Sequence, residues 1–327
     1  MQKQIAIIIP AFTADFLKEA LESIEKQTDK RFQVYIGDDE SPDDLWSITK
    51  QFSQKNGWIY HRFDQNLGKS NLVAHWNRCV ELSSEPWIWL FSDDDVMSED
   101  CISTFYSNQS QFPQQQIFRF SFSIIDQNSQ VKASPSDNWY ELSGFDFGRL
   151  RFERKILSSA VEFIFTRKAY NDNNGFIEFP SAWCSDDASW IAFAESGSIR
   201  KFDKGNVFWR LSGTNISSQA GPYIKIKLKA ALAFIVWFNR RFQAEINSTL
   251  LGEQIIWFRL QIEQVGVEFS FWKGVEYTQK TNPNGLFSWL RTFNEIYLRA
   301  LLNVKYNHKG KKAPWLLKWV SQQLPKY

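Results

Sequence analysis

A short apolar run that ends in three consecutive acids sets the strongest limit on how this chain can fold. The five large apolar residues at 87–91 are followed by Ser92 and then by Asp93, Asp94 and Asp95. Such a run predicts a strand buried on both faces of a sheet, and the acids then emerge at its C-terminal end. In open α/β sheets, ligands bind at that end of the strands.

Two interpretations of these acids stay open. Three adjacent carboxylates repel each other, and a divalent cation that prefers oxygen ligands would turn them into a site that carries the phosphates of a substrate. Alternatively, they form a solvated acidic turn ahead of a helix over 98–107, because acids are favoured at helix N-termini. The stretch alone does not decide between a metal site and a turn.

Strands and helices alternate along the first half of the chain. We expect strands over 5–9, 32–37, 58–63 and 87–91, and helices over 15–27 (with Thr13 as its cap), 43–53 and 72–82. This alternation predicts a mainly parallel, doubly wound α/β sheet. Two more strand-like runs, at 118–125 and 160–165, are separated by a polar loop or hairpin at 127–137, and another lies at 206–209.

The first two strands end in residues that suit a flat ligand. Phe12 follows the first strand, and Asp38 and Asp39 follow the second. Parallel neighbouring strands would bring these ends together, where a ring covers the face of a uracil and a carboxylate accepts its imide N–H. The alternative is that Asp38 and Asp39 cap the helix after Pro42.

A second acidic pair opens a helical stretch from Ser185 to Glu195. Apolar residues follow Asp187 at i+3, i+4 and i+7, which is one face of a helix. We therefore expect Asp187 to point inward and Asp186 to face solvent or cap the helix. An inward carboxylate at a helix start is poorly explained as a capping residue.

Composition narrows the class of protein. The 327 residues carry a net charge of +2, which gives no sign of nucleic-acid binding. Three widely spaced cysteines argue for a reducing compartment and against a disulfide framework or zinc site. The first apolar run ends at Pro10 and no run is long enough to span a membrane, so we expect a cytoplasmic protein without a signal peptide.

Several short motifs, in order, resemble the N-terminal half of family 2 glycosyltransferases of the GT-A fold, over roughly residues 4–215. They are Ile7–Phe12, Ala20–Ile24 with Gln27-Thr28, Gly37–Ser41, Asn66–Gly68, Asn77–Cys79 with Glu81-Leu82, and Ser92–Asp95 in the place of the family's DXD motif. The resemblance implies a mixed, mainly parallel nucleotide-sugar-binding sheet flanked by helices.

The resemblance also implies which residues bind the donor. Those at the positions that hold the nucleoside are Pro10, Ala11, Phe12, Asp39, Asn66, Gly68 and Lys69, although Lys69 reads equally well as a solvated loop lysine. Asp93, Asp94 and Asp95 fall where the family holds the ribose and a Mn²⁺ or Mg²⁺ on the diphosphate. Asp95 is the first choice as metal ligand, with Asp93 acting through ribose or water. Such a metal stabilises the charge of the leaving diphosphate.

The remaining site residues implied by the resemblance lie in the second half. Asp187 matches the catalytic base that deprotonates the acceptor hydroxyl, and Asp186 stands beside it where the family more often has Glu. Arg210 falls where it can meet the diphosphate. Ser212 replaces a His that many relatives carry, which leaves a third protein ligand of the metal unassigned.

After about residue 222 the pattern becomes helical, apolar and basic. We expect helices over 224–241, 250–264 and 286–306, followed by a basic tail that contains Trp315 and Trp319. A cationic, Trp-containing end suits the inner face of the cytoplasmic membrane, where a lipid-linked glycan acceptor would lie. The alternative is a helical subdomain that packs on the core or on a second subunit.

These observations predict a GT-A catalytic domain over 1–218 and a helical region over 219–327. The expected activity is metal-dependent transfer of a sugar, with UDP as the leading donor nucleotide, to a hydroxyl of a polysaccharide or lipid-linked glycan, and the family resemblance implies that the transfer inverts the sugar. A binding protein without turnover is one alternative. A sugar nucleotidyltransferase is another, although residues 10–15 lack the Gly-rich basic loop that this class usually carries.

Overall fold

The computed structural model describes residues 3–136, 138–195, 197–213 and 223–263. The chain divides into two compact units, Met1–Gln243 and Ala244–Tyr327. Their boundary lies 25 residues beyond the boundary expected at 218/219, because the helix over 223–241 packs within the first unit. The helix expected over 286–306 and the basic tail lie outside the described residues.

The first unit is built on one mixed sheet. Its path runs β3-β2-β1-β4-β9-β6-β10-β5, with β7 paired to β6 and β8 to β10. The strands are β1 (Ile5–Ala11), β2 (Phe32–Asp38), β3 (Ile59–Arg62), β4 (Trp87–Leu90), β5 (Val96–Met97), β6 (Ile117–Ile125), β7 (Val131–Ala133), β8 (Glu141–Leu142), β9 (Phe163–Thr166) and β10 (Ile199–Arg210). Strands β1 to β4 are parallel, while β9 runs antiparallel to both of its neighbours. The predicted mixed, mainly parallel α/β sheet is confirmed.

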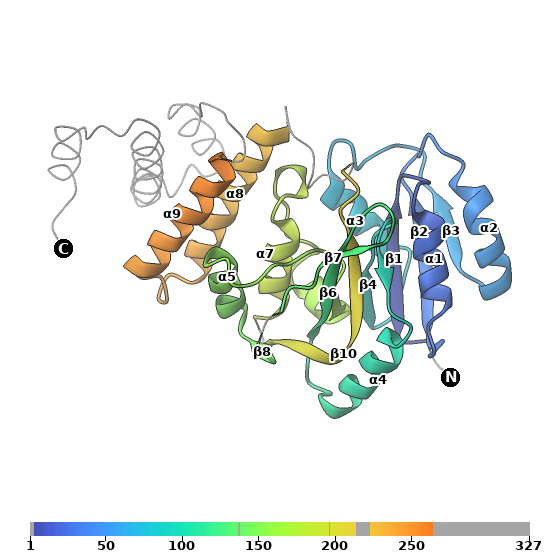
Figure 1. The fold of residues 1–327 in the computed structure, drawn as a ribbon, viewed down its shortest axis with the longest axis horizontal. Helices are drawn as coiled ribbons and strands as arrows, with labels where there is room; N and C mark the ends of the chain where they lie inside the picture. The colour runs from blue at the N-terminus through green and yellow to red at the C-terminus, as the bar shows by residue number, and fades with distance from the viewer. Residues whose placement is uncertain (1–2, 137, 196, 214–222, 264–327) are drawn as a thin grey trace, which may run out of the picture. The chain divides into compact units, whose positions relative to one another are not determined.

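Helices cover the sheet in two groups. They are α1 (Leu17–Glu25), α2 (Leu45–Asn56), α3 (Leu72–Val80), α4 (Cys101–Gln111), α5 (Gly144–Phe152), α6 (Arg167–Asp172), the 3-10 turn η1 (Pro180–Ala182), α7 (Ser185–Phe193) and α8 (Tyr223–Arg241), with α9 (Ser248–Glu263) in the second unit. In Figure 1, α1 and α2 lie together near β1–β3, whereas α5, α7 and α8 lie together beyond β6. None of the described helices has the length and apolarity needed to cross a membrane.

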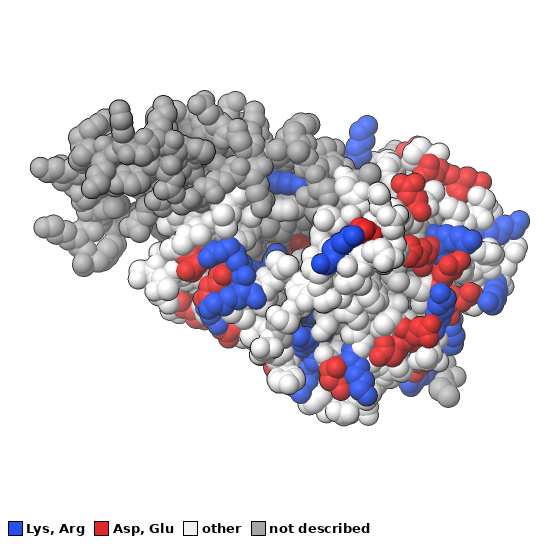
Figure 2. Space-filling model, viewed as in Figure 1, with Lys and Arg blue, Asp and Glu red and all other residues white. Residues whose placement is uncertain are grey.

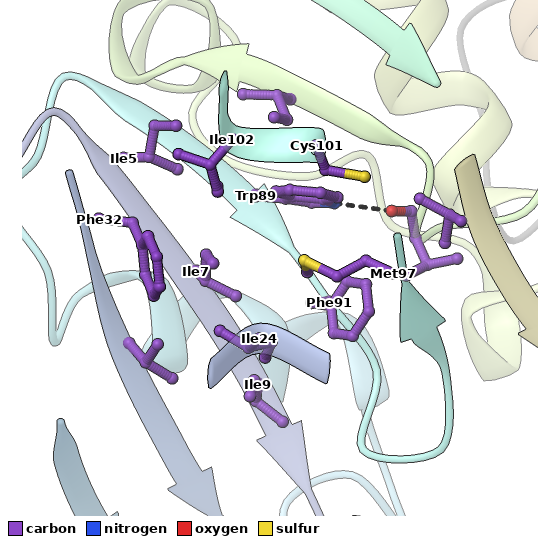
Figure 3. Packing of buried hydrophobic residues seen from close by; sticks show 14 of the residues in the cluster. Ile5, Ile7, Ile9, Ile24, Phe32, Trp89, Phe91, Met97, Cys101 and Ile102 are labelled. Atoms are coloured by element: carbon purple, nitrogen blue, oxygen red, sulfur yellow. Dashed lines mark hydrogen bonds between the residues drawn. The ribbon is translucent and has the colours of Figure 1, made fainter. Parts of the chain in front are cut away.

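The apolar residues of β4 pack in the hydrophobic core of the first unit. Trp89 is fully buried, stacks on Phe120 with ring centroids 5.0 Å apart, and donates its indole N–H to the Val161 carbonyl at 2.7 Å. Figure 3 shows this ring beside Cys101 and Ile102 of α4, within a cluster that also contains Ile5 and Ile7 of β1. Because the indole N–H is bonded, the large ring is buried without the cost of an unpaired donor.

Most predicted elements are confirmed within a few residues, but the predicted caps are wrong. Helix α1 begins after Phe16, which makes no side-chain cap, so Thr13 does not cap it. Helix α2 is capped by Asp44, which accepts from the Ser47 N–H, and Asp38 and Asp39 therefore do not cap it. Helix α5 was not predicted at all.

Candidate active site

The ends of β1, β2 and β4 meet at one edge of the sheet, as predicted. Ala11 pairs with Asp38, and Ile8 pairs with Leu90, one residue before Phe91 ends the apolar run. The acid turn, defined here as residues 92–95, is tied directly to the end of β1. The Phe12 and Thr13 N–H groups both donate to Asp93 Oδ2, at 2.8 and 3.1 Å.

Within the acid turn the three carboxylates differ in exposure. Asp93 and Asp94 are half-buried, whereas Asp95 is 2% exposed and accepts the Arg210 N–H at 2.7 Å. Burial raises the pKa of all three carboxyls. The pKa of Asp93 reaches about 6, with the adjacent Asp94 charge adding to the effect of burial.

Asp95 stays a prediction as the first metal ligand. One of its carboxylate oxygens accepts the Arg210 N–H and its side chain is buried, whereas the side chains of Asp93 and Asp94 are half-buried. No group of three or more His, Cys, Asp or Glu side chains suited to a metal occurs in the described part of the chain. Two carboxylates still fit Mg²⁺, which proteins commonly hold by one or two carboxylates together with substrate phosphates.

Contact between Arg210 and the diphosphate stays a prediction, and the structure shows which groups of the protein bind this side chain. Its side chain is fully buried, and its guanidinium donates to Glu19 Oε2 at 2.6 Å, to the Asp94 carbonyl at 2.7 Å and to the Asp126 carbonyl at 3.0 Å. The same group lies over the Phe16 ring. Through its bond to the Asp94 carbonyl, the Arg210 guanidinium holds the backbone of the acid turn in place. Ser212 follows β10 two residues later, half-buried.

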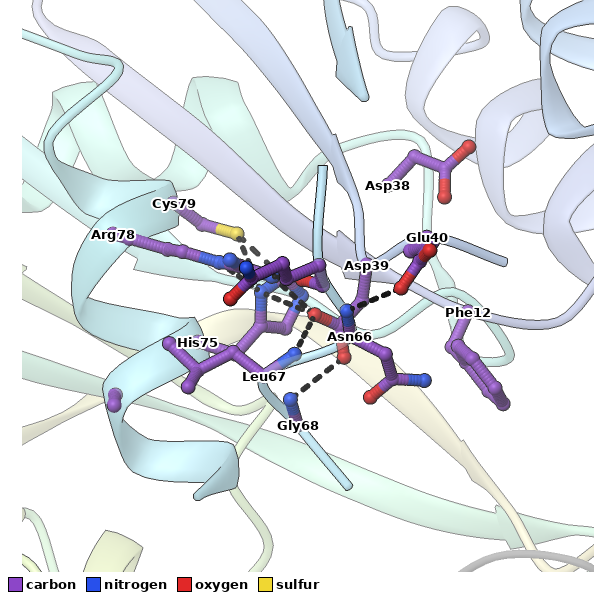
Figure 4. A network of polar contacts seen from close by, with 12 residues as sticks. Phe12, Asp38, Asp39, Glu40, Asn66, Leu67, Gly68, His75, Arg78 and Cys79 are labelled. Atoms are coloured by element: carbon purple, nitrogen blue, oxygen red, sulfur yellow. Dashed lines mark hydrogen bonds and ion pairs between the residues drawn. The ribbon is translucent and has the colours of Figure 1, made fainter. Parts of the chain in front are cut away.

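Asp39 also has a structural task that the sequence did not reveal. It is buried, and its carboxylate accepts the Leu67 and Gly68 N–H groups at 2.9 and 2.8 Å together with a bond from the Arg78 guanidinium. Figure 4 shows these donors around Asp39, with the Phe12 ring on the side away from α3. The carboxylate expected to accept a uracil N–H is thus covered by the 66–69 loop.

The 66–69 loop is held closely against Asp39. A Cβ at Gly68 would lie 2.5 Å from Asp39 Oδ2, so only glycine fits there. Asn66 donates its N–H to Glu40 and accepts the Lys69 N–H, while the Lys69 side chain is exposed. Beside this loop the Phe12 ring is 40% exposed, an open aromatic face at the end of β1.

The acidic pair of α7 is divided as the helical spacing predicts. Asp187 is 3% exposed, and both of its oxygens accept from the Arg151 guanidinium of α5, at 2.9 and 2.8 Å. Asp186 is half-buried, and its pKa rises to about 7 because of burial first and the Asp187 charge second, against a lowering by Arg151.

Hydrogen bonds join α3 to the segment that precedes α7. Asn71, which caps α3 at the end of the 66–69 loop, donates to Glu178 at 2.9 Å, just ahead of η1. Asn77 of α3 accepts the Phe176 N–H at 3.1 Å. Because the Ile177 and Phe179 N–H groups donate to the hydroxyls of Ser189 and Ser185, the segment 176–179 links α3 to the start of α7.

Sequence reasoning missed three side chains that organise this site. Arg151 lies on the unpredicted α5, Glu40 fixes the 66–69 loop, and Arg78 was noted only as part of a motif. For Arg151 a signal existed: Ser143 and Asp146 form a capping pair three residues apart, and this pairing marks a helix start.

Three comparisons bear on identity. Residues 6–173 match the family described as "Glycosyl transferase family 2". The "GalNAc(5)-diNAcBac-PP-undecaprenol beta-1,3-glucosyltransferase" of Campylobacter jejuni is 26% identical over 102 residues, which are 31% of this chain and 33% of that protein. "Glycosyltransferase GlyG" of Streptococcus pneumoniae is 25% identical over 107 residues, 32% of this chain and 35% of that protein. The match thus spans about a third of these relatives' length.

Similarity to solved structures extends over nearly the whole chain. S. aureus TarS 1–349 in complex with UDP-GlcNAc superimposes with a TM-score of 0.61 at 14% identity, covering 96% of this chain and 93% of that one. The same protein in complex with UDP gives a TM-score of 0.56 at the same identity and coverage. This likeness establishes the shared fold, and the family match covers half of the sequence. The chain belongs to glycosyl transferase family 2.

Proposed function

We propose that this protein transfers a sugar from a UDP-sugar, with inversion and with the help of a divalent cation, to a hydroxyl of a lipid-linked or polymeric glycan. One observation carries the proposal: the exposed Phe12 ring and the half-buried Asp93 and Asp94 converge at one edge of the sheet, joined by the Phe12 N–H bond to Asp93. The ring suits a base, and the acids suit a cation on a diphosphate.

Charge and shape support a proposed position for the donor. Phe12 offers the face for uracil, the exposed Lys69 lies on the loop above Asp39, and Asp93 and Asp94 lie where ribose and diphosphate would follow. That a similar fold is seen with UDP and UDP-GlcNAc supports UDP as the nucleotide. The covered Asp39 supports the site indirectly by fixing the loop that carries Lys69.

Mn²⁺ or Mg²⁺ would be held by Asp94 and Asp93, with phosphate oxygens and water completing its shell. When bound, such a cation acts as a Lewis acid that stabilises the charge developing on the diphosphate. Arg210 keeps the turn that carries these carboxylates in place through the Asp94 carbonyl.

The acid pair of α7 supplies the proton acceptor. As the acceptor oxygen forms its bond to the sugar C1, its proton passes to a carboxylate. The bond from C1 to the diphosphate oxygen breaks, and the electron pair leaves with UDP. Attack from the face opposite the leaving group inverts the configuration at C1.

The acceptor is proposed from the relatives and from the surface. The Campylobacter jejuni relative is named for a glycan on undecaprenol diphosphate, which supports a lipid-linked glycan here. Figure 2 shows a broad uncharged area at the centre of the viewed face, with acids and bases mixed around it rather than a field of one sign. We propose that the C-terminal region contacts the membrane surface where such an acceptor lies.

The test is binding of a panel of nucleotide sugars, with and without Mn²⁺, measured by calorimetry on the full chain. We expect one UDP-sugar to bind with the metal, and Asp94→Asn to lose the metal-dependent part. Glu99→Gln removes an exposed acid outside the acid turn, so it is the matched control and should bind as the parent does. Binding of no nucleotide sugar, with or without metal, would contradict the proposal.

Turnover separates this proposal from a binding protein without activity. We expect the parent protein to transfer the sugar of the bound donor to water or to an added glycan and to release UDP. A parent that binds the donor but never releases UDP in the presence of Mn²⁺ would instead support a binding role.

A further inference from the structure

The face of α8 that packs against the protein begins with a lysine. We propose that Lys227 recognises the acceptor: its ammonium, held over the Trp183 ring, binds a phosphate group that the acceptor glycan carries near the accepting hydroxyl. This inference rests on the proposed function and narrows its acceptor to a glycan that bears phosphate, either in the link to a lipid or within a polymer.

The position of Lys227 in α8 is unusual for a charged residue. The residues at i+3, i+4 and i+7 from Lys227 lie on the same face of the helix, and all three, Ala230, Ala231 and Phe234, are fully buried. Charged residues ordinarily occupy the opposite, solvated face of such a helix. Lys227 instead extends the buried face and is itself half-buried.

Ring contacts show what this face of α8 packs against. Phe234 and Trp237 contact Phe179, with ring centroids 6.2 and 6.4 Å from the Phe179 ring, and the helix lies against both η1 and α7. Lys227 lies about two helical turns before Phe234 on the same face. Its side chain therefore reaches the segment that links η1 to α7.

The ammonium of Lys227 is positioned by Trp183, the residue that follows η1. The Lys227 Nζ atom lies over the indole ring, 4.6 Å from the ring centroid, and the electron-rich face of the ring attracts a cation in that position. Burial lowers the pKa of Lys227, because a charged ammonium loses part of its hydration there. The cation–π contact offsets part of this cost and keeps the ammonium beside Trp183.

Trp183 brings this cation close to the acid pair of α7. It stands three residues before Asp186 and is extended between two residues with left-handed backbones, Ala182 at φ 56° and Cys184 at φ 63°. Non-glycine residues in the left-handed region are strained, and such strain concentrates at ligand-binding sites. The strained backbone sets the direction of the Trp183 ring and, through the ring, the position of the Lys227 ammonium.

The charges of the site favour a cation with this task. Asp93 and Asp94 of the acid turn and Asp186 of α7 are half-buried carboxylates, and each would repel an acceptor phosphate. In the sequence no Asp or Glu occurs between Asp203 and Glu245, so α8 carries basic residues without acids. A lysine ammonium offers a phosphate one positive charge and three N–H donors.

The donor diphosphate is the other phosphate at the proposed site. The residues proposed above to bind the donor follow β1 and β4, whereas Lys227 belongs to α8 and contacts the segment before α7. Lys227 is therefore an acceptor-side residue, and the experiment below measures the two phosphates separately.

The test uses the full chain loaded with saturating UDP and Mn²⁺, so that the donor position is filled, and measures binding of small sugars by NMR. We expect glucose 1-phosphate or glucose 6-phosphate to bind more tightly than glucose. Preference for glucose 1-phosphate supports a phosphate in the link to a lipid, and preference for glucose 6-phosphate supports a phosphate within a polymer. If neither binds more tightly than glucose, the inference is overturned.

Variants of Lys227 test the residue itself. Lys227→Gln should weaken binding of the preferred sugar phosphate by roughly 10- to 100-fold, the usual value of a hydrogen bond to a charged group, and leave binding of glucose and of UDP unchanged. Lys227→Arg keeps the charge and should bind within a few-fold of the parent. Lys229→Gln is the matched control, because this half-buried lysine points about 200° away around α8.

Trp183→Leu tests the positioning of the ammonium. Loss of the ring should weaken binding of the sugar phosphate by roughly two- to tenfold, less than loss of the lysine, and Trp183→Phe should restore much of it. Binding to the parent should also weaken as ionic strength is raised. This salt dependence should be smaller in Lys227→Gln, whereas a purely structural role for Lys227 would leave it unchanged.

The inference is overturned if Lys227→Gln binds the sugar phosphate as the parent does, or if it loses affinity for UDP instead. The proposed function then stands wherever the parent still binds and turns over a UDP-sugar, and a parent that binds no UDP-sugar overturns both. Lys227→Met keeps the length of the side chain without its charge and gives the same test if Lys227→Gln does not fold.

Discussion

The start of α7 joins one buried acid to one half-buried acid, the acid turn joins one buried acid to two half-buried acids, and the two places differ in which group the nearby guanidinium binds. At α7 the Arg151 guanidinium pairs with Asp187 itself and leaves Asp186 as a single carboxylate with a pKa of about 7. At the acid turn the Arg210 guanidinium pairs with Glu19 and with backbone carbonyls, and Asp95 accepts a backbone N–H. The surplus negative charge of the acid turn suits the binding of a metal cation. At α7 one carboxylate is neutralised by Arg151 and the other stays open, which suits the uptake of a proton.

The largest effect that tests this comparison is on stability. Arg151→Gln leaves Asp187 buried without its cation, and we expect a loss of about 3–5 kcal/mol in the free energy of unfolding, as for other broken buried pairs. Arg149→Gln on the same helix breaks only part-exposed pairs with Asp146 and Glu153, and should cost less than about 1 kcal/mol. Urea denaturation of both variants measures the difference. Equal losses would mean that the Arg151 pair is no stronger than a surface one.

The next effect concerns the acid turn. We expect Asp94→Asn to reduce turnover in saturating Mn²⁺ by roughly 10²-fold or more, because a bound metal supplies several kcal/mol of charge stabilisation. A titration of Mn²⁺ at fixed UDP-sugar measures it, and the variant should need much more metal. An unchanged metal dependence would remove Asp94 from the cation site.

The aromatic face at the end of β1 should matter somewhat less. Phe12→Ala removes the ring, and we expect donor binding to weaken by about 1–3 kcal/mol, the value of one stacked base. Phe12→Tyr keeps the ring and serves as the matched variant. Calorimetric affinities for UDP alone isolate this contribution, and equal affinities for parent and Phe12→Ala would place the base elsewhere.

The smallest effect per step is the pH dependence of the parent. A carboxylate of the α7 acid pair must be ionised to accept a proton, and the pKa of Asp186, the half-buried member of that pair, is raised to about 7. The rate of UDP release should therefore rise about tenfold for each pH unit below 7 and level off above it. Rates from pH 5 to 9 at saturating donor show this directly. A rate already level from pH 5 upward would point to a base with an ordinary carboxyl pKa.

The sequence predicted the sheet well because its signals are local. The run at 87–91 became β4 with Trp89 fully buried, and the acids emerged at the strand end where ligands bind. The helical spacing after Asp187 likewise predicted its inward direction. The spacing of apolar residues along the chain indicates which face of a strand or helix is buried, and this spacing can be read from neighbouring residues.

The partners of the site residues could not be predicted in the same way. Asp39 is 28 residues from Leu67, Asp187 is 36 residues from Arg151, and Arg210 is 191 residues from Glu19. These long-range contacts decide which carboxylates are bonded within the protein and which stay open to a ligand. Ligand contact by Asp95, Asp39 and Arg210 stays a prediction, and the backbone bonds that all three make in the structure could not be predicted from the sequence.

The most direct test of this division of labour measures donor binding and UDP release on the same two variants, Asp94→Asn and the double variant Asp186→Asn with Asp187→Asn, with Mn²⁺ present. We predict a crossed result: Asp94→Asn loses the metal-dependent part of donor binding, while the double variant binds like the parent but releases UDP at least about 100-fold more slowly. If the double variant turns over like the parent, or if both variants lose only binding, the two acid clusters do not divide the work as described.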